Sequence, residues 1–258
     1  ADGEELIALG DRAIADVVEQ LIALDPEAVA INLLFSFLDD RHEKALEAAL
    51  EGRFFVSRSS FVLPEYREYE RGVATWLNAW LGPLMSRYLD SLQQAVAPSS
   101  LAVMQSSGLS VNAGLASRRA VNLLLSGPVG GLRSAQFVAP DAGLMTFDMG
   151  GTSTDVALID GNLTLTGEAK IAQLPVAVPM ADIHTIGAGG GSIAYVDAGG
   201  VLHVGPVSSG ARPGPACYGL GGSAPTVTDA NLQLGRLQPD AFMGGAMQLD
   251  RSAAEAAL

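Results

Sequence analysis

The sequence is poor in cysteine, lysine and long apolar runs. Its single cysteine, Cys217, excludes an internal disulfide and a cysteine-rich metal cluster, and favours a reducing, cytoplasmic setting. The only lysines are Lys44 and Lys170, and neither closes a glycine-rich loop of the Walker type. No apolar run approaches the roughly 18 residues that a membrane span requires. No signal-peptide pattern precedes the first helical segment.

Basic residues are also scarce. The chain has 15 Lys and Arg against 28 Asp and Glu, which gives a formal net charge of −13. Such a field repels nucleic acid and anionic membranes, so neither is expected as a partner. Most of the imbalance lies in residues 1–107, where 17 acidic residues stand against 8 basic ones. We interpret these acidic residues as solvated helix faces rather than as a metal site.

Glycine, in contrast, is abundant and unevenly placed. The 30 glycines include 25 after residue 107, and they follow no three-residue period, which excludes a collagen helix. Disorder is also excluded, because 48% of the residues are hydrophobic and the mean hydropathy is +0.28. The shift in composition predicts two domains, residues 1–97 and 98–258, with the boundary at the Pro98-Ser99-Ser100 segment.

Helical and strand patterns alternate through residues 1–97. The apolar spacing predicts a helix, a buried strand, a second helix and a second strand, over residues 4–24, 28–37, 40–52 and 54–62. A long helix then runs from Pro64 to about Val96, with Trp76 and Trp80 on its core face. The first part is therefore an α/β segment that ends in a long interdomain helix.

One segment of the second part carries chemistry. A strand over residues 143–148 ends in Asp148, a Gly150-Gly151 pair follows, and Asp155 precedes strands predicted over 156–159 and 163–165. A glycine pair between antiparallel strands lets backbone N–H groups approach an anion with no Cβ in the way. Hydroxyl donors follow the pair at Thr152, Ser153 and Thr154. The two aspartates are candidate catalytic and metal-binding residues that hold a Mg²⁺-bound water or orient an attacking one. The alternative is a structural hairpin turn.

The pattern D-x-G-G-T-S-T-D-V over residues 148–156 resembles the phosphate loop of the actin, sugar kinase and heat-shock ATPase superfamily. More narrowly, it is similar to the central loop of the hydantoinase A / 5-oxoprolinase family, which includes N-methylhydantoinase A-like proteins. Further similarities to that family lie at residues 63–79, 126–131, 184–194, 205–219 and 225–231. The resemblance covers roughly residues 26–258.

The resemblance implies an α/β protein with an actin-like ATPase (ribonuclease H-like) fold, present here in part, whose strand-rich glycine-loop lobe binds nucleotide. It implies ATP and Mg²⁺ as cofactors, and a hydantoinase B-type subunit or domain as partner. It also implies phosphorylation of the carbonyl oxygen of a cyclic amide, such as 5-oxoproline or a hydantoin, so that water can attack the carbon. Association into a homo-oligomer is left open.

The family also carries a first phosphate loop near its N-terminus and an adenosine-contacting segment beyond the equivalent of Leu258, and neither is found here. We therefore expect the central part of a longer subunit, which alone binds ATP weakly and is inactive. Two departures from the family pattern, at residues 59–61 and 107–109, leave the substrate open. Alternative functions are an ATP-dependent ketone carboxylase subunit, which shares these motifs, and a non-catalytic nucleotide-sensing or scaffolding module of the same fold.

Several further residues have two interpretations each. A second glycine loop either cradles phosphate or a substrate carboxylate, or lets two backbones pack closely, and its residues are Gly189, Gly190, Gly191 and Ser192. His184 is an acid/base group or substrate ligand, or a structural histidine. Arg212 contacts an anion or lies exposed on its loop. Cys217 is a nucleophile only if a cation such as Arg212 lowers its pKa, and otherwise a buried small hydrophobe.

Overall fold

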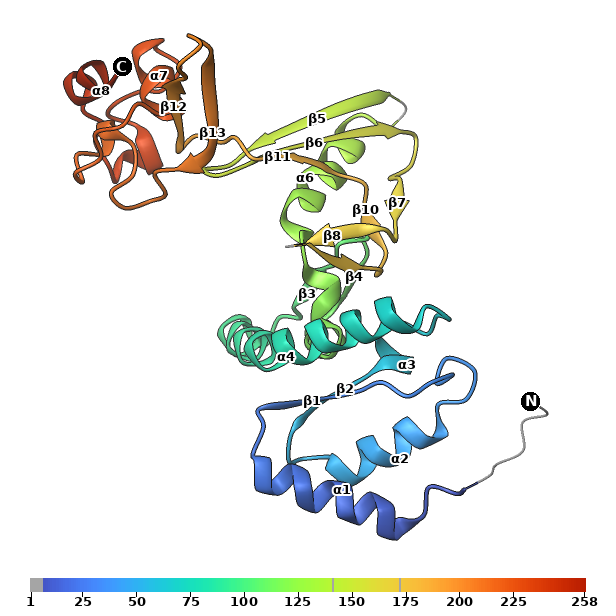
Figure 1. The fold of residues 1–258 in the computed structure, drawn as a ribbon. Coiled ribbons are helices and arrows are strands. Elements are labelled where there is room, and N and C mark those ends of the chain that lie inside the picture. The colour runs from blue at the N-terminus through green and yellow to red at the C-terminus, as the bar shows by residue number, and fades with distance from the viewer. Residues whose placement is uncertain (1–6, 141, 172) are drawn as a thin grey trace. The chain divides into compact units, whose positions relative to one another are not determined.

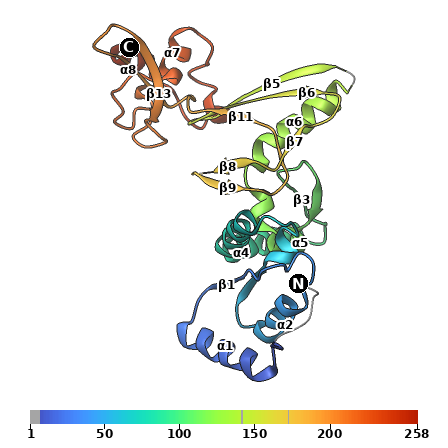
Figure 2. The same ribbon diagram turned by 45° about the vertical axis from the view of Figure 1, so that its right-hand side comes forward.

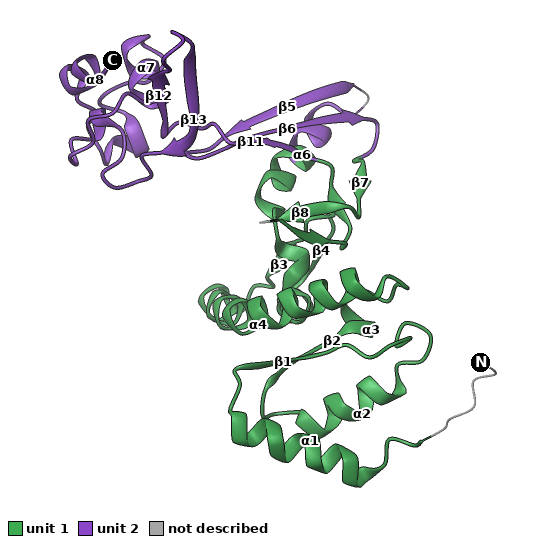
Figure 3. Ribbon diagram, in the orientation of Figure 1, with its two compact units in different colours: residues 1–133, 163–182 green, residues 134–162, 183–258 purple. Residues whose placement is uncertain are grey.

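The computed structural model describes residues 7–140, 142–171 and 173–258. The chain divides into two compact units, each built from segments that are separated in sequence (Figure 3). Unit 1 combines the chain up to Arg133 with Leu163–Asp182, and unit 2 combines Ser134–Asn162 with Ile183–Leu258. Both units mix helices and strands, as the sequence predicts.

Unit 1 holds helices α1 (Asp11–Leu24), α2 (Arg41–Leu50), α3 (Ser59–Val62), α4 (Glu68–Val96), α5 (Ala113–Arg118) and the 3-10 helix η1 (Ala120–Leu123). Its strands are β1 (Ala28–Ile31), β2 (Phe55–Arg58), β3 (Ala102–Met104), β4 (Ser110–Asn112), β7 (Leu165–Thr166), β8 (Ala169–Ile171), β9 (Leu174–Val176) and β10 (Met180–Ala181).

Helix α6 (Ser126–Val138) passes from unit 1 into unit 2. The strands of unit 2 are β5 (Gly143–Met149), β6 (Thr154–Asp160), β11 (His184–Ile186), β12 (Ser192–Val196) and β13 (Leu202–Ser208). Its helices are α7 (Val227–Gln233) and α8 (Arg251–Ala257), with the 3-10 helices η2 (Ala216–Tyr218) and η3 (Phe242–Gly245). No described helix is both long enough and apolar enough to cross a bilayer.

The first layer of unit 1 is a parallel pair of strands between helices. Strands β1 and β2 pair from Ala28 with Phe55 to Ile31 with Arg58, and helix α2 makes the crossover that a parallel pair requires. Figures 1 and 2 show α2 and α4 on opposite sides of this pair. Gly82 of α4 faces the pair, and a Cβ there would stand 2.0 Å from the Phe55 ring. The glycine therefore sets how closely helix and strand approach.

A buried carboxylate joins α2 to the chain around it. Glu43 accepts hydrogen bonds from the backbone N–H groups of Leu33 and Ser60 and from the hydroxyls of Ser59 and Ser60, at 2.6–2.9 Å. Burial alone would raise the pKa of Glu43, but these hydrogen bonds outweigh it and hold the pKa below its usual range. The ionised form is therefore stabilised by folding.

Replacing Glu43 with glutamine is expected to lower the free energy of unfolding at pH 7 by about 2–3 kcal/mol, because an amide replaces a charged acceptor facing four donors. Since the folded pKa is depressed, this stabilisation is present above the usual pKa of glutamate and is lost as the pH falls through the folded value. Urea unfolding at several pH values measures both effects. Exposed Glu51→Gln is the control, and equal stability of the two variants would contradict the assignment.

Helix α4 carries the main core of unit 1. Ala74 and Leu77 of α4 pack with Val121 of η1 and with Val176 and Val178 around β9. The expectation that Trp76 and Trp80 lie on the core face is wrong, because they are 51% and 68% exposed and stack on each other with ring centroids 6.2 Å apart. The spacing of apolar residues predicts an apolar face on α4, but it does not show which face of the helix the core covers.

Other differences from the predicted elements have local causes. The first strand stops at Ile31, and the chain then turns over residues 34–38, with Phe35 at a φ of +58°. The second predicted strand divides into β2 and the short helix α3. The strand predicted over residues 163–165 corresponds to β7, which pairs with β10 and not with β6. Residues 4–6 of the first predicted helix lie outside the described residues, and α1 begins at Asp11.

The structure also divides the chain differently from the predicted boundary at Pro98. Residues beyond Pro98 remain in unit 1, because Leu89 of α4 packs against Ala113 and Ala116 of α5. The glycine content of the sequence rises where the glycine loops begin, whereas the boundary of a compact unit depends on which segments pack together. The two positions differ here by about 35 residues.

Candidate functional site

The glycine-rich phosphate pattern lies on a three-stranded antiparallel sheet of unit 2, in the order β11-β6-β5. Strands β5 and β6 form a hairpin, and β11 lies along β6 (Figure 1). In the register of these strands, Asp148 stands directly opposite Asp155, and Thr185 is beside Asp155. Side chains of paired residues share a face of the sheet. Asp148, Asp155 and Thr185 therefore form one row across the three strands, next to the loop.

The two aspartates face each other across the hairpin without a basic partner among the described residues. Like charges directly opposite each other on a sheet repel, and no ion pair to either carboxylate is present within the described residues. The Thr185 hydroxyl donates to Asp155 Oδ1 at 2.7 Å and so fixes that carboxylate. The described residues contain no cluster of three or more metal-ligating side chains. Two carboxylates nevertheless fit Mg²⁺, which takes one or two of them together with water and substrate phosphates.

The two glycine loops of the sequence pack against each other. The backbone N–H groups of Gly190 and Gly191 donate to the carbonyl oxygens of Gly150 and Gly151 at 2.9 and 2.7 Å. A Cβ on Gly189 would stand 2.7 Å from three backbone atoms of the first loop, in residues 150, 152 and 153. Close backbone packing therefore accounts for glycine at 189.

The amide groups of the two loops differ in availability. All four N–H groups of the second loop are used within the protein, since Gly189 N–H donates to Ser192 Oγ, and Ser192 N–H to Gly189 O, at 2.8 and 3.0 Å. In the first loop Gly150 N–H donates to Ser153 O at 2.9 Å. The N–H groups of Gly151, Thr152 and Ser153 take no part in the bonds that join the loops. The nitrogens of Thr152 and Ser153 lie beside Gly189, and contact with nucleotide stays a prediction for both loops.

The three hydroxyl groups of the first loop differ in the same way: one bonds to the second loop, and two do not. Thr154 is buried, and its hydroxyl donates to the carbonyl oxygen of Ala188 at 2.6 Å, so it holds the second loop. Thr152 is exposed and Ser153 is half-buried. Of the three predicted hydroxyl donors, only these two remain candidates for phosphate contact.

His184 and Arg212 do not join the carboxylates. His184 pairs with Val156 on β6, one position from Asp155, so it lies on the opposite face of the sheet. Arg212 is exposed on the loop after β13. That loop is tied to the second glycine loop through Ser209, whose N–H donates to Gly191 O at 2.8 Å. Contact of either residue with substrate stays a prediction.

Sequence reasoning missed two supporting threonines. The role of Thr185 could not be predicted from the sequence, because it depends on the register of β11 against β6. Thr228 donates from both its N–H and its hydroxyl to Gly190 O, each at 2.8 Å, and so ties α7 to the second loop. A signal for it existed in Thr226-x-x-Asp229, which forms a capping box at the start of α7.

Cys217 is a structural residue in this arrangement. It is fully buried with Leu232, Leu249 and Ala254, and its N–H donates to Asp229 Oδ1 at 2.8 Å. Burial, followed by the nearby Asp229 carboxylate, raises the pKa of the thiol to about 12. A thiol that stays protonated at neutral pH is not a nucleophile.

The folded protein is therefore expected not to react with a disulfide reagent such as 5,5′-dithiobis(2-nitrobenzoate) at pH 8. Because Cys217 is the only cysteine, unfolding in guanidinium chloride should release one reactive thiol per chain. Absorbance of the released thiolate measures both states. Rapid reaction of the folded protein would contradict the structural role.

Together, these features define a mixed α/β protein with a glycine hairpin flanked by two paired carboxylates. The profile of the hydantoinase/oxoprolinase family matches residues 71–258. The chain therefore belongs to this family.

Two relatives illustrate the range of the family. Caprolactamase subunit alpha of Pseudomonas jessenii is 38% identical, over 98% of this chain and 38% of that protein. The 5-oxoprolinase of Saccharomyces cerevisiae is 37% identical, over 90% of this chain and 18% of that protein. This chain thus spans well under half the length of these relatives.

Two solved structures are also similar to this chain over nearly all of its length. The crystal structure of the ATP-dependent caprolactamase from P. jessenii matches with a TM-score of 0.77 and 39% identity, over 100% of this chain and 39% of that one. The nucleotide-free structure of acetone carboxylase, described as an enzyme of ATP-dependent acetone carboxylation, matches with a TM-score of 0.73 and 28% identity. It covers 98% of this chain and 38% of that one.

Proposed function

We propose that the chain is the phosphate-binding part of an ATP-dependent hydrolase of cyclic amides, with an actin-like ATPase fold present in part. The observation that carries the proposal is the pairing of Asp148 with Asp155 beside a first loop in which the N–H groups of residues 151–153 take no part in the hydrogen bonds between the loops. ATP supplies the phosphoryl group when bound. The protein's task is then to position that group and to balance its charge, which is most of what phosphoryl transfer needs.

Different residues would carry out different parts of this task. The N–H groups of Gly151, Thr152 and Ser153 donate to phosphate oxygens. Asp148 and Asp155 would hold Mg²⁺ and orient water, with Thr185 keeping Asp155 in place. The second glycine loop and Thr154 support the first loop from behind. This support preorganises the donors, so little reorganisation is needed when phosphate binds.

Relatives favour an amide substrate. Those named for caprolactam and 5-oxoproline act on lactams, and ATP activation of a lactam carbonyl suits the chemistry above. A ketone carboxylase subunit is the second candidate, because the acetone carboxylase structure also matches. A hydantoinase B-type partner and a cytoplasmic location complete the proposal. The exposed apolar side chains of Met145, Phe147 and Leu158, on one face of β5 and β6, are of the kind that a partner covers.

The test is release of ADP and phosphate by the full-length subunit with its B-type partner. Caprolactam, hydantoin, 5-oxoproline, and acetone with bicarbonate are supplied in turn. Turnover that depends on a lactam is expected, and this result supports the proposal. Turnover only with ketone and bicarbonate would assign the carboxylase function. Absence of turnover with every substrate would favour the non-catalytic scaffold.

A further inference from the structure

Unit 1 holds a cluster of arginine side chains at the carboxyl end of strand β2. Arg58 is the last residue of β2, and Phe61 follows it in α3. The guanidinium carbons of Arg118 and Arg119 lie 4.6 and 4.4 Å from the centroid of the Phe61 ring, close enough for cation–π attraction. That of Arg58 lies 5.9 Å from the same point. Parallel α/β sheets place their ligands at this end of the strands.

The three arginines differ in how their charge is balanced. Arg58 is buried and bonds to Glu47 and Asp40 at 2.9 and 3.0 Å. Arg118 is exposed and reaches Glu47 at 3.8 Å. Within the described residues, the side chain of Arg119 has neither an ion pair nor a hydrogen bond. The charge of Arg119 is therefore left without a counterion among those residues.

This missing partner is costly because Arg119 is partly buried. Its Nε is a buried atom with no hydrogen-bond partner in the described part of the chain, as is Oδ1 of Asn122, three residues further on. Burial, followed by the charge of Arg118, lowers the pKa of Arg119. A guanidinium group nevertheless stays charged at neutral pH. Buried charges in proteins are paired, because an unpaired one loses its hydration without compensation. An anion beside Arg119 would remove this cost.

The backbone that carries the two arginines is held on both sides. The buried side chain of Asn78 donates to the carbonyl oxygen of Arg118 at 3.0 Å and accepts from the N–H of Val121 at 3.1 Å. The N–H of Arg119 donates to the carbonyl oxygen of Leu115 at 3.0 Å. A fixed backbone leaves only side-chain freedom to be lost when a ligand binds, which lowers the cost of binding.

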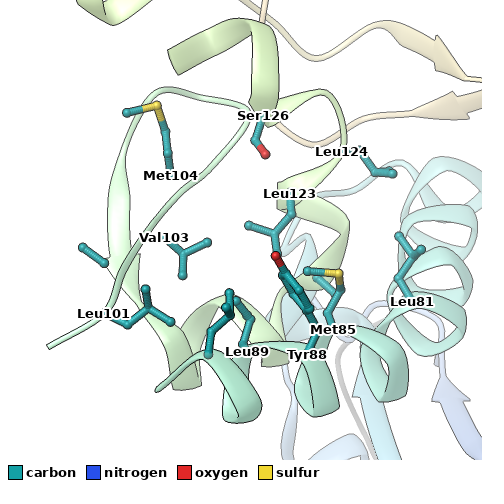
Figure 4. Close-up of a pocket in the computed structure, with 13 residues that line it drawn as sticks. Leu81, Met85, Tyr88, Leu89, Leu101, Val103, Met104, Leu123, Leu124 and Ser126 are labelled. Carbon is teal, nitrogen blue, oxygen red and sulfur yellow. The ribbon is translucent and has the colours of Figure 1, made fainter. Parts of the chain in front are cut away.

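The apolar cavity of unit 1 is not part of this cluster. It has a volume of about 430 Å³ and lies between α4, β3 and η1 (Figure 4). Ala120 and Leu123 of η1 line it, and the described residues around it include no arginine. The apolar side chains of η1 therefore line this cavity, whereas Arg119, which precedes η1, lies at the ring of Phe61 in α3.

We propose that Arg118 and Arg119 bind the carboxylate of a small molecule beside the Phe61 ring. The guanidinium fork matches a carboxylate through two parallel hydrogen bonds. A carboxylate also carries the single negative charge that balances Arg119, whereas a phosphate dianion carries one charge too many. Phe61 lies in one of the two segments that depart from the family pattern. We therefore assign the site to this chain rather than to the whole family. The assignment does not rest on the proposed function.

Chemical modification of arginine tests the site in the full-length subunit. Phenylglyoxal reacts with accessible guanidinium groups, and mass spectrometry of the digested protein gives the rate at each arginine. Sodium acetate is the probe, and chloride and phosphate are compared at equal ionic strength. Acetate is expected to slow modification of Arg119 saturably by at least ~5-fold, with less than ~2-fold slowing by the other two salts. The rate at exposed Arg12 of α1 should not change.

Two results of this experiment would overturn the proposal. The first is slowing by chloride or phosphate that equals the slowing by acetate, because the site would then not select a carboxylate. The second is an Arg119 that stays unreactive in every salt, because a carboxylate of the subunit itself would then cover it.

Variants of Arg119 separate binding from folding. Arg119→Gln removes an unpaired charge, so it should not lower the urea concentration at the midpoint of unfolding. Acetate should raise this midpoint for the wild-type subunit and for the control Arg12→Gln, relative to chloride, but not for Arg119→Gln. Arg119→Lys keeps the charge without the fork and should respond less than the wild type. An Arg119→Gln midpoint that rises with acetate as much as that of Arg12→Gln would overturn the site. A clearly lower midpoint in chloride would also overturn it, because Arg119 would then have a structural partner.

Discussion

Asp148→Asn is expected to lower the kcat for lactam-dependent ATP hydrolysis by the full-length subunit on the order of 100-fold. Asparagine keeps the shape of the side chain but removes a charge that would hold Mg²⁺ opposite Asp155. Folding should be unaffected, because Asp148 is exposed and loses no ion pair. Phosphate release under saturating ATP measures the effect, and circular dichroism checks the fold.

Asp160→Asn is the matched control for this variant. Asp160 is also an exposed aspartate of the same hairpin, but it lies at the far end, opposite Gly143. The control should retain activity within about twofold of the wild-type value, because this site is remote from the loop. If Asp148→Asn hydrolyses ATP as fast as Asp160→Asn, the phosphate-binding role of this hairpin is wrong.

Gly189→Ala is expected to be the most damaging single substitution in the second loop. The added Cβ would stand 2.7 Å from Gly150 O, Thr152 N and Ser153 N, all of them backbone atoms that cannot rotate away. The loops must then separate, and the hydrogen bonds between them are strained or lost. We expect a loss of about 1–3 kcal/mol in the free energy of unfolding. We also expect ATP binding to weaken, because the phosphate-facing amides lose their support.

Urea unfolding and a nucleotide-binding titration of the full-length subunit measure the two effects. Gly143→Ala is the control, since a Cβ at Gly143 meets nothing within 4 Å and no left-handed backbone is required there. This control should change stability by less than about 0.5 kcal/mol. Equal stability of the two variants would show that the loops do not pack as described.

Local patterns predicted several elements of this chain. The Asp-Met-Gly-Gly-Thr segment at residues 148–152 is a short-range signal, and the structure places it on the β5–β6 hairpin as expected. Helices α2 and α4 also follow from residues close in sequence. So does the end of α2 near Gly52, whose φ is +74°. These features depend on periodicity and on backbone freedom, which each segment carries with it.

Other features could not be predicted from local sequence patterns. The sequence left open whether Gly189–Gly191 bind a ligand or pack against backbone, because both require glycine. The same limit applied to Trp76 and Trp80, whose spacing indicates an apolar stripe but not what covers it. The role of Thr185 required the register of β11 against β6, a pairing of segments 30 residues apart.

The family resemblance, the glycine pair and its two flanking aspartates could be found from the sequence, because each lies in contiguous residues. Long-range contacts, in contrast, join the second glycine loop to the first, place His184 on the opposite face from Asp155, and bury Cys217 beside Asp229. It also decided that each unit is built from two separate stretches of chain. Such outcomes depend on contacts between distant segments, and packing energies select among arrangements that local propensity leaves equal.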